Sequence, residues 1–93
     1  MEAGIDGYLA WARVERGLSE NTLSAYARDL RCLADWLKER NIEQAEEVTR
    51  PDLSEYMGFL LDTGRSHRTS ARHRAAFRQL FRFLQREGRL EVD

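Results

Sequence analysis

The chain has 93 residues, of which 42% are hydrophobic and 33% are charged, and its formal net charge is −1. This composition is typical of one small globular domain and excludes the disordered and collagen-like classes of protein. No apolar run approaches the ~18 residues that span a bilayer, and the N-terminus lacks a signal-peptide pattern. Because Cys32 is the only cysteine, no internal disulfide can form. We therefore expect one cytoplasmic domain over residues 1–93, with no membrane partner.

The first predicted helix covers about residues 3–16. Its apolar residues recur at spacings of three and four and form one buried face: Ile5, Tyr8, Leu9 and Ala12. Trp11 and Val14 fall outside this face. They either cover the edge of the core or contact a partner protein.

A longer amphipathic helix is predicted from residue 20 to about residue 40, with Ser19 as its N-cap and Asn41 at its end. The residues of its buried stripe are Leu23, Tyr26, Leu30, Leu33, Ala34 and Leu37. The opposite face carries Asn21, Ser24, Arg28 and Arg31. Short polar groups and arginines near a helix N-terminus suit contact with phosphate, although an ordinary solvated face has the same composition.

The acidic connection over residues 42–48 has room for a short helical turn. A third helix is predicted after it, with Thr49 as N-cap, Pro51 in the first turn and Gly64 at the end. The core stripe of this helix is Leu53, Tyr56, Met57, Leu60 and Leu61. Phe59 lies outside the stripe and is a third candidate for contact with a partner protein.

The fourth predicted helix covers about residues 69–87 and buries Phe77, Leu80, Phe81 and Leu84, with His73 at the border. Arg68 and Arg72 point away from this face, one turn apart. Residues 1–64 carry a net charge of −6 and residues 65–93 a net charge of +5, and the segment 65–86 contains seven arginines and no acid. Arginine suits phosphates and guanine edges, so this segment favours contact with nucleic acid.

The sequence contains no pattern of a catalytic or metal site. It has no HExxH or CxxC spacing and no glycine-rich phosphate loop, and no nucleophile is paired with a base. We therefore expect no enzyme activity, metal, cofactor or small-molecule substrate. No segment alternates with a period of two, so the predicted fold is an all-α bundle of four main helices with a possible short fifth turn.

Two stretches resemble the N-terminal core-binding domain of Xer-type tyrosine recombinases and phage integrases. They are ERGLSENTLSAYARDL at residues 15–30 and SHRTSARHRAAFRQLFRFLQREG at residues 66–88. The resemblance covers about residues 5–90, in the order and spacing of the family. It implies a SAM-like orthogonal bundle in which the second and fourth helices cross and reach the major groove of duplex DNA.

The resemblance also implies which side chains contact DNA. The better-matched positions are Asn21, Thr22, Ser24 and Ala25 in the second helix and Arg68, Thr69 and Arg72 in the fourth. Adjacent, less closely matched positions are Arg28, Arg65, Ser66 and His67. For Arg68 and Arg72, the helical periodicity and the resemblance agree.

The family's catalytic pattern does not occur in this chain. No tyrosine follows Tyr56, and neither His67 nor His73 is followed three residues later by arginine. The chain is thus expected to bind a recombination site without cutting it, as one part of a longer recombinase or as a separate module. The alternative hypothesis is a helical protein-interaction module, with Trp11, Val14 and Phe59 contacting other recombinase subunits in a synaptic tetramer.

Overall fold

The computed structural model describes residues 1–90, which form an all-α fold. Its elements are α1 (Glu2–Glu15), α2 (Glu20–Lys38), the 3₁₀ turn η1 (Ala45–Glu47), α3 (Arg50–Asp62) and α4 (His67–Arg86). The predicted fold class is confirmed, and η1 is the short fifth turn. Within residues 1–90 there is no strand. Helix α4 begins two residues before the predicted start, because the side chain of Ser66 accepts the Thr69 N–H at 3.1 Å and caps the helix there.

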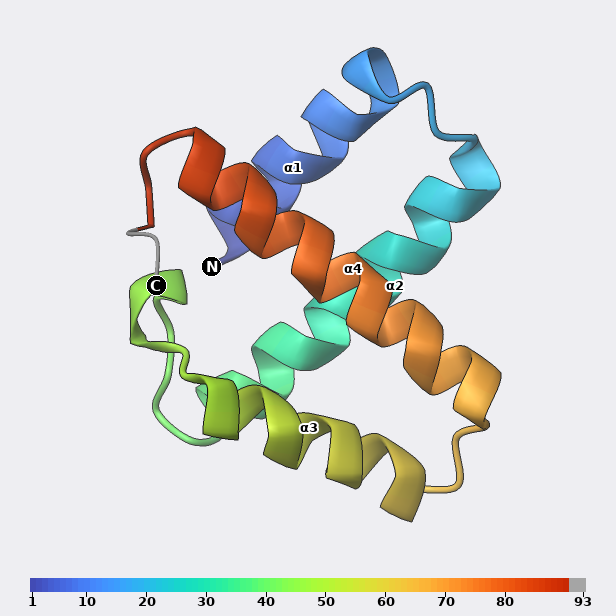
Figure 1. The fold of residues 1–93 in the computed structure, drawn as a ribbon, viewed down its shortest axis with the longest axis vertical. Coiled ribbons are helices and arrows are strands. Elements are labelled where there is room, and N and C mark those ends of the chain that lie inside the picture. Colours follow the sequence, from blue (N-terminus) through green and yellow to red (C-terminus); the bar gives the residue numbers. More distant parts are fainter. Residues whose placement is uncertain (91–93) are drawn as a thin grey trace.

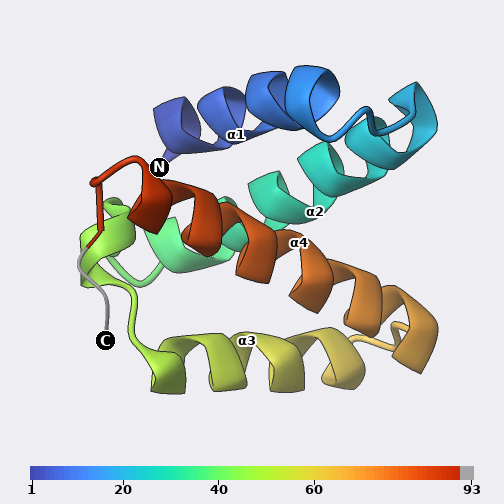
Figure 2. The same cartoon turned by 45° about the horizontal axis from the view of Figure 1, so that its top comes forward.

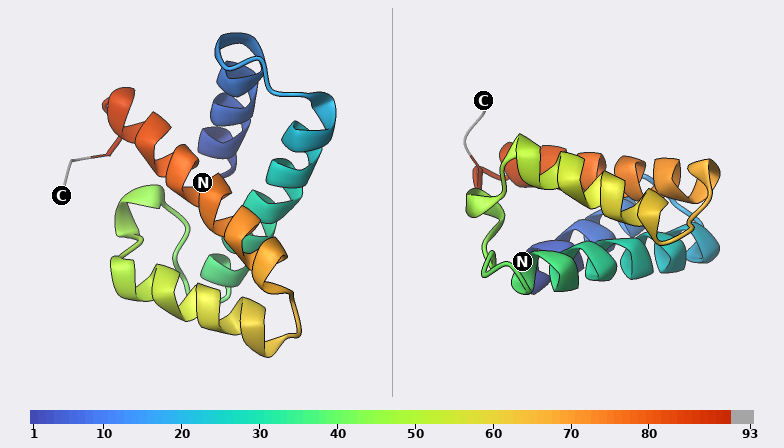
Figure 3. Two further views of the ribbon diagram at one scale, coloured as in Figure 1. Left: turned by 45° about the vertical axis from the view of Figure 1, so that its right-hand side comes forward. Right: turned by 90° about the horizontal axis from the view of Figure 1, so that it is seen from below.

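The helices form two crossed layers. Helices α1 and α2 make one layer, and α3 and α4 make the other (Figures 2 and 3). Helix α4 contacts each of the other three helices and crosses over the middle of α2 (Figure 1). This crossing is the feature that positions the candidate site.

Local sequence explains where the helices start and stop. The side chain of Ser19 accepts the Thr22 N–H at 3.2 Å, and Thr49 and Asp52 cap each other reciprocally at 3.2 and 2.9 Å. After α2 the chain turns at Asn41, whose φ of 63° lies in the left-handed region that asparagine tolerates. These caps confirm the predicted N-terminal residues of α2 and α3.

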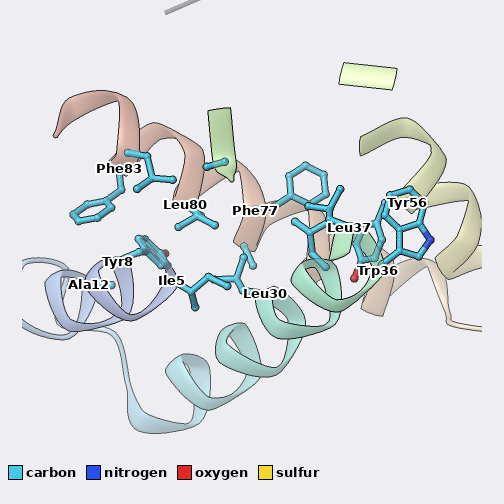
Figure 4. Packing of buried hydrophobic residues seen from close by; sticks show 14 of the residues in the cluster. Ile5, Tyr8, Ala12, Leu30, Trp36, Leu37, Tyr56, Phe77, Leu80 and Phe83 are labelled. Atoms are coloured by element: carbon cyan, nitrogen blue, oxygen red, sulfur yellow. The ribbon is translucent and has the colours of Figure 1, made fainter. Parts of the chain in front are cut away.

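A single apolar core lies between the two layers (Figure 4). Most of the predicted stripe residues are buried or half-buried, and Tyr8, Tyr56, Leu30 and Leu80 are at most 1% exposed. The prediction for Leu61 is wrong, since its side chain is 44% exposed. Leu61 is rotated by about 100° from the buried Leu60, which turns it past the surface where α3 meets the core.

Two of the three candidates for a protein interface, Trp11 and Phe59, pack against the core. The Trp11 ring lies 5.3 Å from that of Phe83, and the Phe59 ring lies 6.2 Å from that of Trp36, centroid to centroid. Both side chains are half-buried. Trp11 therefore covers the edge of the core, which was one of its two predicted roles. Val14 is 77% exposed and contributes no such packing.

Candidate nucleic-acid interface

The first turns of α2 and α4 lie on the same side of the helix crossing, to the right in Figure 1. Both starts are built alike, each with a serine cap and a threonine three residues later. The Ser19 hydroxyl donates to Thr22 Oγ1 and the Ser66 hydroxyl donates to Thr69 Oγ1, both at 3.1 Å. Two helix N-termini, each with a positive dipole end, thus face one side of the molecule.

One side of α2 is tied to the loop that leads into α4. Spacings of four, three and four positions place these residues in one stripe: Asn21, Ala25, Arg28 and Cys32. Arg65 Nη2 lies 3.8 Å from Cys32 Sγ, and Arg65 Nη1 donates to Thr63 Oγ1 at 2.8 Å. The stripe and the start of α4 therefore belong to one continuous surface.

The predicted DNA-contacting residues differ in their exposure to solvent. Asn21, Arg28, Ser66, His67 and Arg68 are exposed. The half-buried members are Thr22, Ala25, Arg65 and Thr69. Ser24 is exposed and borders the stripe, about 40° around α2 from Arg28, on the edge away from the buried Asp29.

Arg72 is bound within the domain, which the sequence did not predict. Its Nε and Nη2 groups donate to the two carboxylate oxygens of Asp29 at 2.8 and 2.9 Å. The Asp29 side chain is 3% exposed, whereas that of Arg72 is 41% exposed. The hydrogen bond to Asp29 raises the pKa of Arg72. The prediction that Arg72 points outward therefore holds only for one edge of its guanidinium group.

A buried histidine extends this pair into a four-residue chain. His73 Nε2 lies 3.2 Å from Asp29 Oδ1, and His73 Nδ1 lies 3.0 Å from the Tyr56 hydroxyl. Because the carboxylate only accepts, Nε2 carries the proton and Nδ1 accepts from Tyr56. Burial lowers the pKa of His73 and raises that of Tyr56. His73 is only 5% exposed and thus lies in the core rather than at its border.

The neutral state of His73 predicts how stability depends on pH. Its folded-state pKa lies below the ordinary value of 6.5, so below that pH the unfolded chain binds a proton that the folded chain does not. We expect the free energy of unfolding to fall as pH drops from about 6.5 to 5.5, with a slope of up to about 1.4 kcal/mol per pH unit. Urea denaturation followed by circular dichroism at a series of pH values measures this slope.

Two substitutions assign the slope to one histidine. His73→Gln lowers stability but removes the fall between these pH values, and His67→Gln, which replaces the other histidine of the chain, is the matched control. Equal slopes in the wild type and in His73→Gln would contradict the assignment.

Asp29 is the residue of this region that sequence reasoning missed. A signal was present, because Asp29 lies three residues after Tyr26 and four before Leu33, within the apolar stripe of α2. A charged residue in a buried stripe requires a partner. Its partner is 43 positions away in the chain, and only the crossing of α2 and α4 brings the two together.

Other kinds of site have no support among the residues that the structure describes. Over residues 1–90, no group of three histidine, cysteine, aspartate or glutamate side chains is placed to hold a metal ion. In the same range, none of the helices combines the length and the apolar character needed to cross a membrane.

Comparison with known proteins agrees with the all-α fold. Residues 5–88 match the family described as phage integrase, N-terminal SAM-like domain. The chain is 37% identical over 87 residues to the tyrosine recombinase XerD of Staphylococcus aureus strain Mu50, and equally so to XerD of Staphylococcus haemolyticus. These alignments cover 94% of this chain and 30% of each relative. No solved structure matches the chain. The chain belongs to the family of phage integrase N-terminal SAM-like domains.

Proposed function

We propose that this chain is the DNA-binding domain of a site-specific tyrosine recombinase and that it holds duplex DNA through α2 and α4. The observation that carries the proposal is the joining of the start of α4 to the middle of α2 by the Arg72–Asp29 and Arg65–Cys32 contacts, which makes one surface of the two helices. The arginines of α4 then lie beside the polar stripe of α2. A surface with these donors and a net positive segment suits a polyanion.

Each part of the surface has a distinct chemical role. The capped starts of α2 and α4 offer backbone N–H groups and a positive dipole end to phosphates. Arg28, Arg65 and Arg68 add guanidinium groups for the DNA backbone, and Asn21 offers an amide for a base edge. Helices α2 and α4 cross at their middles and diverge toward the side of their N-termini (Figure 1). These groups are therefore spread along the bound duplex and are not gathered at one base pair.

The cutting and rejoining of DNA belongs, in this proposal, to the part of the recombinase that this chain does not match. The chain spans 30% of the length of the curated relatives, which are tyrosine recombinases by name. Its three tyrosines are poorly placed for attack on a phosphate, because Tyr8 and Tyr56 are fully buried and Tyr26 is half-buried. We expect binding without cleavage, in the cytoplasm, alongside other recombinase subunits.

Arg68→Ala tests the proposal against Arg31→Ala as a matched control. Arg68 is exposed at the start of α4, whereas Arg31 lies on the side of α2 next to α1, 3.6 Å from Asp6. Because Arg68 is assigned to the DNA backbone, its loss removes a charge-assisted contact and should weaken binding to every duplex roughly 10- to 150-fold, corresponding to about 1.5–3 kcal/mol. Arg31→Ala removes the same charge from a side chain that is already paired with Asp6, so it should change affinity by less than about threefold. Fluorescence anisotropy at low salt with duplexes that carry recombination sites measures both.

An NMR titration locates the contact independently of any substitution. Addition of the same duplexes should shift the backbone amide signals of residues 19–28 and 65–72 and leave those of α3 nearly unchanged. If no duplex shifts any signal at low salt, the proposal fails. Nicking of supercoiled plasmid by the pure chain would contradict binding without cleavage.

A further inference from the structure

Arg72 presents only one of its two hydrogen-bonding edges to solvent. A guanidinium group has five N–H donors. Asp29 accepts two of them, from Nε and Nη2, at 2.8 and 2.9 Å. Three N–H groups remain, on Nη1 and Nη2, and 41% of the side chain is exposed. The free edge is therefore the end of the side chain, which carries a parallel pair of donors.

The Asp29 carboxylate that binds Arg72 is held in place by hydrogen bonds that connect three helices. Asp29 belongs to α2 and is 3% exposed, and its Oδ1 also accepts the Nε2–H of His73 from α4 at 3.2 Å. His73 in turn accepts from Tyr56 of α3, which is 0% exposed and packs against Trp36 (Figure 4). Neither Asp29 nor His73 can rotate without breaking a buried hydrogen bond. The position of the Arg72 guanidinium is thus fixed by the core.

Stability alone does not account for an aspartate at this position. A buried ion pair is often no more stabilising than apolar side chains of the same volume, because both charges lose their hydration. The pair does determine the net charge at the position of Arg72. The negative Asp29 offsets the positive Arg72, which weakens the attraction of this arginine for an anion but leaves its free donors intact.

We propose that Asp29 is a positioning residue that holds the free edge of Arg72 toward the bound duplex, where Arg72 recognises a guanine. The inference rests on the proposed function. Guanine presents two neutral acceptors, N7 and O6, side by side in the major groove, and they match a parallel pair of N–H donors. A phosphate also offers two acceptor oxygens, but the neutralised Arg72–Asp29 pair favours the uncharged guanine edge over the anion.

Replacement of Asp29 by asparagine distinguishes positioning from simple electrostatics by the sign of the effect. Asp29→Asn removes a negative charge near the proposed DNA surface, so electrostatics alone predicts tighter binding to every duplex. Positioning predicts lost preference for guanine. The probes are duplexes that the wild-type chain selects from a randomised library at low salt. Each is compared with versions that carry 7-deazaguanine, which lacks the N7 acceptor, at one position at a time.

At one guanine, we expect the wild type to lose about tenfold in affinity on 7-deaza substitution, within the range for a bidentate contact. Asp29→Asn, Arg72→Gln and the double variant should all show no loss at that guanine. Positioning predicts that the double variant binds DNA as weakly as either single variant. A general structural defect in Asp29→Asn would instead weaken the binding of the double variant further than the loss of Arg72 does. Asp6→Asn is the matched control, since it makes the same charge change at the exposed Arg31 pair. It should keep the full preference.

Wild-type NMR keeps the proposal testable if Asp29→Asn fails to fold. The Nε–H signal of Arg72 should exchange slowly with water both in the free chain and in the duplex complex, because Asp29 retains that proton throughout. Rapid exchange in the complex would mean that Arg72 leaves Asp29 for the DNA, and this would overturn positioning.

The other outcomes separate the inference from the proposed function. If Arg72→Gln removes the preference and a folded Asp29→Asn retains it, Asp29 does not position Arg72. If no guanine position depends on Arg72 while Arg68→Ala still weakens binding, Arg72 contacts phosphate or nothing, and only the inference fails. If neither arginine affects binding, the proposed function fails as well.

Discussion

Replacing Leu80 with alanine is expected to lower the free energy of unfolding by about 2–5 kcal/mol. Leu80 is 0% exposed in α4 and packs in the middle of the core, between Phe83 and Phe77 in Figure 4. The truncation removes apolar contacts and leaves a cavity that the two helical layers can only partly close. A domain of this size has a total stability of roughly 5–14 kcal/mol, so the variant loses a large part of it. Urea denaturation followed by circular dichroism measures the change.

Leu61→Ala is the matched control, because it makes the same chemical change on α3 at a side chain that is 44% exposed. Its effect should stay within about 0.5 kcal/mol, the usual range for a surface substitution. Similar losses for both variants would show that Leu61 is part of the core after all, contrary to the structure.

Raising the salt concentration from about 50 to 200 mM is expected to weaken duplex binding roughly 40-fold, if three arginines each neutralise one phosphate. The three are Arg28 and Arg68, which are exposed, and Arg65, which is half-buried. Each phosphate contact releases counterions, so the steepness with which affinity falls with salt is proportional to the number of those contacts. Anisotropy titrations at several salt concentrations give the slope of the logarithm of affinity against the logarithm of salt.

Single alanine substitutions at these arginines should each make the slope shallower by about one. The Arg31→Ala variant should keep the wild-type slope, since Arg31 lies next to α1. A slope that is near zero in the wild type, or that none of the three substitutions alters, would contradict phosphate contact by this surface.

The starts of α2 and α3 could be predicted from the sequence because their causes are local. Ser19 and Thr49 cap α2 and α3 through atoms three residues away. The buried stripes were predicted for the same reason, since a helix repeats its faces every three or four residues. The family resemblance added the topology of the bundle, and the match to residues 5–88 confirms that resemblance.

Trp11, Phe59 and Leu61 show what periodicity omits. A helical wheel gives the direction of a side chain but not its reach, and the large rings of Trp11 and Phe59 extend around their helices to the core. For Leu61 the error was the width of the buried face, which depends on how α3 is tilted against its neighbours. Neither quantity is local, and so neither could be predicted from spacing.

The candidate site was partly predictable in the same sense. Arg68 lies at the start of α4, where periodicity and the resemblance both indicate it, and the resemblance alone indicates Ser66 as an adjacent position. The engagement of Arg72 by Asp29 depends on residues 43 positions apart, and no local pattern specifies that pairing. The sequence therefore predicted which side chains could donate hydrogen bonds to DNA. The structure adds which of their N–H groups already donate to an acceptor within the domain.

The two-layer arrangement has a consequence for how the chain reaches its folded state. Each layer joins two helices that are consecutive in sequence, so most of its contacts close short loops and form quickly, as in other helical domains that fold within microseconds to milliseconds. The pairing of Arg72 with Asp29 requires the layers to dock first. The surface that is proposed to hold a duplex is therefore a property of the docked layers and is absent from either helix pair alone.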